Sequence, residues 1–183
     1  KMTILAKRYG VRVFVIDNLM ILEMSTSEEY KAQRAAMPDA LKEQMKSIFE
    51  AVEALNTIQM VKESFEPKVN TIVGLSNISN GCPKELRPLI NRVFGVLAYG
   101  AGLDAVILDA KDTELVRIFK MLENNQPTSS VDKLYTSLAN MIANFQELDE
   151  IEYDSNDTEQ CNIIKTATIL LNKKIYSDSF TQV

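Results

Sequence analysis

Residues 71–110, TIVGLSNISNGCPKELRPLINRVFGVLAYGAGLDAVILDA, decide the fold of this chain. Two apolar, β-branched runs, at residues 69–75 and 104–108, flank a stretch at residues 86–99 whose apolar side chains recur at helical spacing. Two glycines follow this stretch, where a helix would end. Strand, helix and strand in this order predict a parallel βαβ unit with a right-handed crossover.

The same alternation starts further upstream. Residues 11–16, VRVFVI, predict a buried parallel strand that Asp17 and Asn18 end. A long helix should begin near Pro38, and its apolar stripe consists of Leu41, Met45, Ile48, Phe49, Val52 and Leu55. We therefore expect an α/β protein with three parallel strands, near residues 11–17, 69–75 and 104–109.

Beyond Asp109 the pattern predicts helices only. Asp112 can cap a helix that runs through Leu122, Ser130 can cap a second helix, and a last helix should span about residues 157–174. Residues 147–159 hold seven acids and no base. This acidic run is either a face exposed to solvent or a docking surface for a basic partner.

Composition excludes several classes of protein. With 183 residues, 46% of them hydrophobic, the chain can form one globular core, and its net charge of −5 carries no basic stripe for nucleic acid. The absence of histidine and of paired cysteines excludes zinc sites, Ser-His-Asp triads and Cys-His pairs within this chain. No apolar run has the length of a membrane helix and no signal peptide is recognisable, so we expect a cytoplasmic protein that does not associate with membranes. We also expect that this chain binds no metal.

Polar residues follow each predicted strand. These are Asp17 and Asn18, Ser76 and Asn77, and Asp109. Because the carboxyl ends of parallel strands meet at one edge, such acids and amides could hydrogen-bond a flat nitrogen heterocycle there. From spacing alone, each of these residues could equally be a helix cap or a turn residue.

Several motifs resemble one enzyme family. GLSN in residues 74–77, RPLINR in residues 87–92, and GLDA followed by a strand ending in Asp109 resemble the seventh and eighth βα units of methyltetrahydrofolate:corrinoid/iron-sulfur protein methyltransferases. VFVIDNLMIL resembles the sixth strand of this family, and TATILLNKKIYSDSF its closing helix. The resemblance implies the C-terminal part of a pterin-binding (βα)8 TIM barrel, with an extra helical insertion at about residues 119–162.

The resemblance also implies an activity and a site. The family transfers the N5 methyl group of methyltetrahydrofolate to the Co(I) centre of a corrinoid protein, which itself carries the cobalamin. Asn77 matches a catalytic residue near N5, and Asp17 matches a carboxylate that pairs with the pyrimidine part of the pterin. Arg87 matches an arginine that orders the site, and further pterin contacts are expected from Ser79, Asn80 and Asp109. The family forms homodimers of the full barrel.

Three alternatives remain open from the sequence. The chain could serve an O-demethylation system or a methionine-synthase-like module, with similar donor and acceptor. It could also be a non-catalytic half-barrel that dimerises or needs a partner subunit, because three strands cannot close a barrel of eight. The helical insertion could contact a second barrel, dock the corrinoid protein, or have no separate role.

Overall fold

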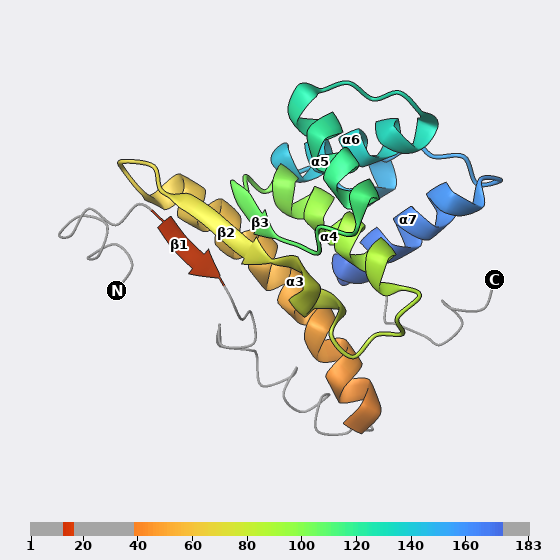
Figure 1. Ribbon diagram of the computed structural model, residues 1–183, viewed down its shortest axis with the longest axis horizontal. Helices are drawn as coiled ribbons and strands as arrows, with labels where there is room; N and C mark the ends of the chain where they lie inside the picture. Colours follow the sequence, from red (N-terminus) through yellow and green to blue (C-terminus); the bar gives the residue numbers. More distant parts are fainter. Residues whose placement is uncertain (1–12, 17–38, 174–183) are drawn as a thin grey trace.

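A three-stranded parallel sheet forms the centre of the computed structural model, which describes residues 13–16 and 39–173, with side chains from residue 51 onward. The strands are β1 (Val13–Ile16), β2 (Asn70–Gly74) and β3 (Ala105–Ile107), and β2 lies between the other two (Figure 1). Ile72 of β2 is in register with Val15 of β1 and with Ala105 of β3. The α/β class and the parallel order predicted from the sequence are therefore confirmed.

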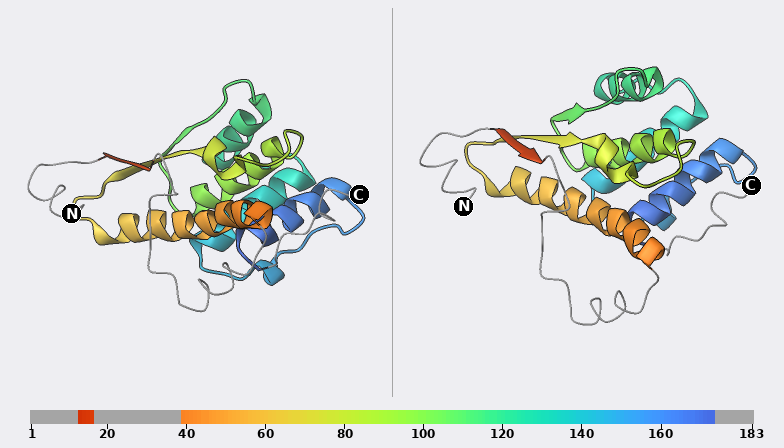
Figure 2. Two further views of the ribbon diagram at one scale, coloured as in Figure 1. Left: turned by 90° about the horizontal axis from the view of Figure 1, so that it is seen from below. Right: turned by 60° about the horizontal axis from the view of Figure 1, so that its bottom comes forward.

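Two helices connect the strands. Helix α3 (Asp39–Ser64) leads from β1 to β2 and runs along the strands, and α4 (Arg87–Gly100) leads from β2 to β3 (Figure 2). Because strand side chains alternate between faces, Val73 and Leu75 point into the core that these helices share, whereas Ala105 and Ile107 of β3 are exposed. The sheet thus has one buried face and, in the described part, an exposed apolar side chain at Ile107.

Three more helices complete the core. Helix α5 (Thr113–Asn124) begins at the predicted cap, where Asp112 accepts a hydrogen bond from the Leu115 amide. Helix α6 (Ser130–Ala143) is capped by Ser129, not by Ser130, because the Ser129 hydroxyl is the one that accepts from the Asp132 amide. Helix α7 (Thr158–Leu170) begins where the sequence predicted, with Asp157 as its cap, and it ends earlier than residue 174.

The helices that follow β3 pack on α4 and belong to the same core. The boundaries expected for the insertion, residues 119 and 162, lie inside α5 and α7, which are continuous. Buried side chains of α6 and α7, among them Leu138, Met141 and Ile163, join the core cluster around α4. Asp132, 1% exposed, accepts hydrogen bonds from Arg117 of α5 at 2.7 Å and from Thr128, which ties α5 to α6.

A charged cluster joins the elements at the amino ends of the strands. Lys62 of α3 donates to both carboxylate oxygens of Asp104 at 2.9 Å, and the Thr71 amide donates to Asp104 at 2.7 Å. Partial burial raises the pKa of Asp104, but the hydrogen bonds from Lys62 and Thr71 lower it more, so this pKa lies below its usual range. In parallel α/β folds this end of the sheet serves stability, so we assign the cluster a structural role.

The acidic run between α6 and α7 faces solvent. Its acidic side chains are exposed apart from Asp157, whereas Leu148 and Ile151 pack partly buried against the core. The run includes the 3-10 turn η3 (Leu148–Glu150). Glu147 pairs with Lys173 beyond the end of α7. These positions match the interpretation as a solvated face, and docking of a basic partner stays a prediction. Within residues 39–173 no helix is both long enough and apolar enough to span a membrane.

Candidate functional site

A short 3-10 turn, η2 (Leu75–Ser79), follows β2 and presents the first candidate residues. Leu75 and Ile78 are buried, and the hydroxyl of the buried Ser79 donates to the Ser76 carbonyl at 3.2 Å. This anchoring leaves Ser76 and Asn77 exposed at the carboxyl end of β2. The turn therefore holds Asn77 at the edge where parallel sheets carry their sites.

The side chain of Asn77 folds back over Gly74. A Cβ atom built on Gly74 would lie 3.4 Å from the Asn77 amide nitrogen. Successive residues of a strand point to opposite faces, and Val73 faces the helices. The position where a side chain would leave Gly74 is therefore on the other face of the sheet. Asn77 thus lies beside the Gly74 backbone, which carries no side chain, on that opposite face.

The loop after η2 positions Arg87 at the start of α4. The loop closes through hydrogen bonds from the Cys82 amide to the Ser79 carbonyl and from Arg87 Nε to the Cys82 carbonyl, at 3.1 and 2.9 Å. Burial raises the pKa of the Cys82 thiol more than the neighbouring Arg87 lowers it. Cys82 is therefore protonated at neutral pH and is a poor nucleophile.

A pocket of about 600 Å³ opens between the loop after β2, the start of α4, the loop after β3 and the start of α5. Three residues expected from the sequence, Ser79, Arg87 and Asp109, line it together. Asp109 also accepts a hydrogen bond from the Lys111 amide at 2.9 Å, which makes it a turn residue as well. The carboxyl ends of β2 and β3 thus share one cavity.

Some charges around this pocket neutralise one another. Arg92 donates to Asp112 at 2.7 Å, and Glu114 pairs with Arg117. The hydrogen bond from Arg117 lowers the pKa of Glu114, so this residue stays ionised near neutral pH. The Arg92–Asp112 pair connects α4 to the cap of α5, whereas the Glu114–Arg117 pair lies within α5.

Other polar groups of the pocket have no such partner. Among the described residues, Lys84, Arg87 and Lys111 take part in no salt bridge. Asn91 lies one helical turn beyond Arg87, and its buried Oδ1 has no hydrogen-bond partner among the described residues. The sequence analysis missed Lys84, Asn91 and Lys111. The available signal was that Lys84 and Lys111 lie in the loops after two strands, and that Asn91 is four residues after Arg87.

The expected site residues fall into three groups. Ser79, Arg87 and Asp109 line the pocket, whereas Asn77, on η2, does not. Asn80 is exposed, does not line the pocket, and donates its amide to the Asn77 carbonyl at 3.2 Å. Asp17 and Asn18 lie outside the described residues.

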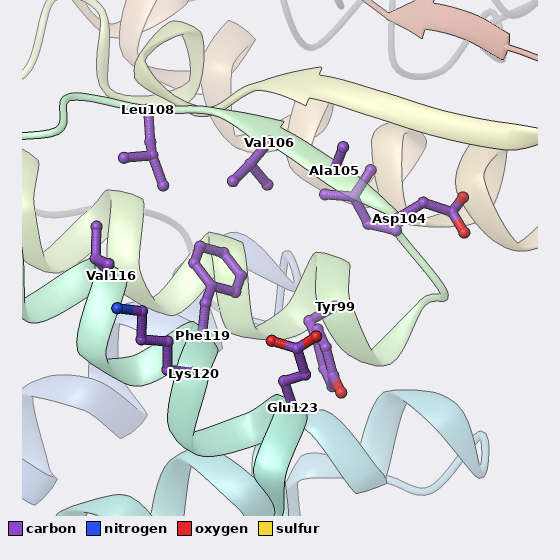
Figure 3. Close-up of a pocket in the computed structure, with 10 residues that line it drawn as sticks. Tyr99, Asp104, Ala105, Val106, Leu108, Val116, Phe119, Lys120 and Glu123 are labelled. Atoms are coloured by element: carbon purple, nitrogen blue, oxygen red, sulfur yellow. The ribbon is translucent and has the colours of Figure 1, made fainter.

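A second pocket, of about 430 Å³, lies between β3 and α5 and contains none of the expected residues. Figure 3 shows Val106 and Leu108 of the β3 segment facing Val116 and Phe119 of α5, with Lys120 and Glu123 nearby. Its lining is mainly apolar, so it offers few groups that could take part in a reaction.

In the part of the chain that the structure describes, no cluster of three or more acidic or cysteine side chains could hold a metal ion. The amides, hydroxyls, lysines and the arginine at the carboxyl edge can supply hydrogen bonds and positive charge. Neither a protein-family model nor a solved structure matches this chain.

Proposed function

We propose that the chain forms the C-terminal part of a pterin-binding TIM barrel that transfers the N5 methyl group of methyltetrahydrofolate to a corrinoid protein. One observation carries the proposal: the Asn77 amide lies beside the bare backbone of Gly74 at the carboxyl end of a parallel strand. The motifs around these residues resemble the methyltetrahydrofolate:corrinoid/iron-sulfur protein methyltransferases. The cobalt that accepts the methyl group belongs to the partner protein.

The chemistry of methyl transfer explains why an amide suits this position. A neutral tertiary amine is a poor leaving group, so N5 must gain a proton or a stronger hydrogen bond as the C–N bond breaks. An Asn side chain can both accept and donate, and it does not titrate. Asn77 can therefore accept from a protonated N5 or donate to a neutral N5 and remain a partner throughout the reaction.

The exposed side of β3 supports the proposal that these strands belong to a larger barrel. In the described part of the chain, β3 pairs only with β2, and Ile107 is 54% exposed. Unpaired edges and exposed apolar side chains of parallel strands are normally covered by further strands. The same observation favours the second candidate, a non-catalytic half-barrel that pairs with another subunit.

Catalysis and the acceptor separate the remaining candidates. A half-barrel without catalytic function would transfer no methyl group, even as the dimer that the family resemblance implies. An O-demethylation or methionine-synthase-like module would keep the donor site and differ in the protein that takes the methyl group. Rates with different corrinoid proteins, compared with the rate with free cob(I)alamin, distinguish these two.

The test of the proposed function is Asn77→Ala in the intact protein. In single-turnover reactions with methyltetrahydrofolate and cob(I)alamin, methyl transfer should slow by about 100-fold. The dissociation constant of methyltetrahydrofolate should change by less than about fivefold, since one hydrogen bond to a bound ring contributes little. Asn140→Ala, which truncates an exposed asparagine of α6, is the matched control and should transfer at the normal rate. Unchanged transfer by Asn77→Ala would exclude Asn77 from the reaction.

A further inference from the structure

The loop after η2 contains an asparagine followed by a glycine, Asn80 and Gly81. Asn80 has φ −63° and ψ 132°, and Gly81 has φ 82°, which are the angles of the two central residues of a type II β-turn. The hydrogen bond from the Cys82 amide to the Ser79 carbonyl, at 3.1 Å, closes this turn. Both central residues are exposed, and neither the Asn80 side chain nor the Gly81 amide makes a hydrogen bond with any described residue.

This pair places a nucleophile next to an electrophile. The amide nitrogen of the residue after an asparagine can attack Cγ of the asparagine side chain, and a glycine leaves the approach open because it has no Cβ. The surroundings are open as well, since a Cβ atom built on Gly81 would meet no atom within 4 Å. Attack requires the peptide group between Asn80 and Gly81 to rotate. Glycine permits this, because it accepts both its present φ and the negative φ of a type I turn, and both turns keep the closing hydrogen bond.

Other asparagines lack this combination. Asn80 is the only asparagine of the sequence that precedes a glycine. Asn140 lies within α6, and the bulky Met141 follows it. The exposed Asn156 precedes Asp157, and its side-chain amide donates to Asp154 at 3.2 Å. The chemistry is therefore expected at one position.

We propose that Asn80 is a site of spontaneous deamidation. The Gly81 nitrogen bonds to Asn80 Cγ, the bond between Cγ and Nδ2 breaks, and the Gly81 amide proton leaves with Nδ2 as ammonia. The product is a succinimide ring. Water then adds to one of the two ring carbonyls and opens the ring, which gives aspartate or isoaspartate and one new carboxylate. The reaction needs water alone, with no oxidant or cofactor.

The modification changes the loop that holds Arg87. In isoaspartate the chain runs through Cβ and Cγ, which lengthens the backbone between Ser79 and Cys82 by one atom, so the 3.1 Å closing bond cannot keep its geometry. The Cys82 carbonyl also accepts from Arg87 Nε at 2.9 Å, and Arg87 lines the pocket at the carboxyl ends of β2 and β3. Isoaspartate therefore loosens this loop, whereas aspartate leaves its backbone length unchanged.

Peptide mapping by mass spectrometry tests the reaction. The intact protein is incubated at 37 °C at pH 7.4 and pH 9, and the conversion of each asparagine is followed. Asn80 should convert at least about tenfold faster than Asn140 or Asn156, and faster at pH 9, because the attacking amide must lose its proton. Asn80→Gln is the matched variant and should stay intact, since its longer side chain would have to form a larger ring.

Two results would overturn the proposal. One is conversion of Asn80 no faster than that of Asn140 and Asn156. The other is a folded protein that stays unmodified while a synthetic peptide of residues 76–86 deamidates, because the turn would then prevent the attack.

The reactivity of Cys82 tests the effect on the loop. Burial is the larger influence on the pKa of this thiol and raises it, so a loosened loop lowers the pKa and increases the thiolate fraction. In a Cys161→Ser background, Ellman's reagent should react about threefold faster with protein that carries isoaspartate than with fresh protein. Asn80→Asp, which has the charge without the longer backbone, should react like fresh protein. Equal rates for isoaspartate-containing and fresh protein would refute the loosening of the loop.

Discussion

Replacing Gly100 by alanine tests how α4 and α6 are packed. A Cβ atom on Gly100 would lie 2.2 Å from the carbonyl oxygen of Ala139, 2.9 Å from its carbonyl carbon and 3.0 Å from its Cα. All three atoms are backbone atoms of α6, within the range Ser130–Ala143, so none can rotate away as a side-chain end could. The two helices would have to move apart.

The size of the effect follows from these distances. An ordinary contact begins at 3.4 Å, so the helices must separate by about 1 Å. At that separation, the atoms that face each other across the α4–α6 contact lose about a quarter to a half of their dispersion energy. Overpacking of this kind destabilises by about 3 kcal/mol. Alanine gains about 1 kcal/mol over glycine in a helix. We therefore expect Gly100→Ala to lower the free energy of unfolding by about 2 kcal/mol.

Urea unfolding at 25 °C measures this difference. With an m-value of about 2 kcal/mol/M, the midpoint should fall by about 1 M at unchanged m. Gly95→Ala is the matched control, because its Cβ would meet Phe119 Cζ at 2.9 Å, the far end of a side chain that can turn. Gly95→Ala should lose less stability than Gly100→Ala, since helix propensity offsets part of the strain. Equal midpoints for Gly100→Ala and the wild type would refute the packing argument.

Two further predictions concern charged clusters outside the site. Asp132→Asn should lower the free energy of unfolding by about 2 kcal/mol at pH 7, because a buried carboxylate loses its charged bonds to Arg117 and Thr128. The hydrogen bond from Arg117 is the largest effect that holds the pKa of Asp132 below its usual value. The stabilisation by the ionised Asp132 is therefore fully present above about pH 4 and is lost as the pH falls below about 4. Denaturant unfolding across pH 2–7 checks this, and a difference between the two proteins that stays constant down to pH 2 would contradict it. Lys62→Met should destabilise by about 1 kcal/mol, since both partners are partly exposed, and should raise the pKa of Asp104. A carboxyl NMR titration that leaves this pKa unchanged would show that Lys62 does not hold it down.

Local sequence signals predicted most elements because they depend on neighbours in the chain. The helix expected at residues 86–99 is found at Arg87–Gly100, and the Asp112 cap was correct, since both follow from spacing within a few residues. Ser129 and Ser130 are both good caps, and only the actual backbone course chose Ser129. The helical insertion expected at about residues 119–162 stays a prediction, and the structure adds that its helices pack around α4 as part of the core.

The sequence by itself determined the α/β class, the order of strands and helices, and the residues at the strand ends, because periodicity and turn chemistry are local properties. Only the tertiary structure decided which of those residues share a cavity: Ser79, Arg87 and Asp109 meet there, while Asn77 turns toward Gly74 on the opposite face of the sheet. It also brought Lys84, Asn91 and Lys111 together around this cavity. Whether a charged or buried polar group finds a partner depends on which residues of other segments lie next to it in the fold. No single stretch of sequence contains that information.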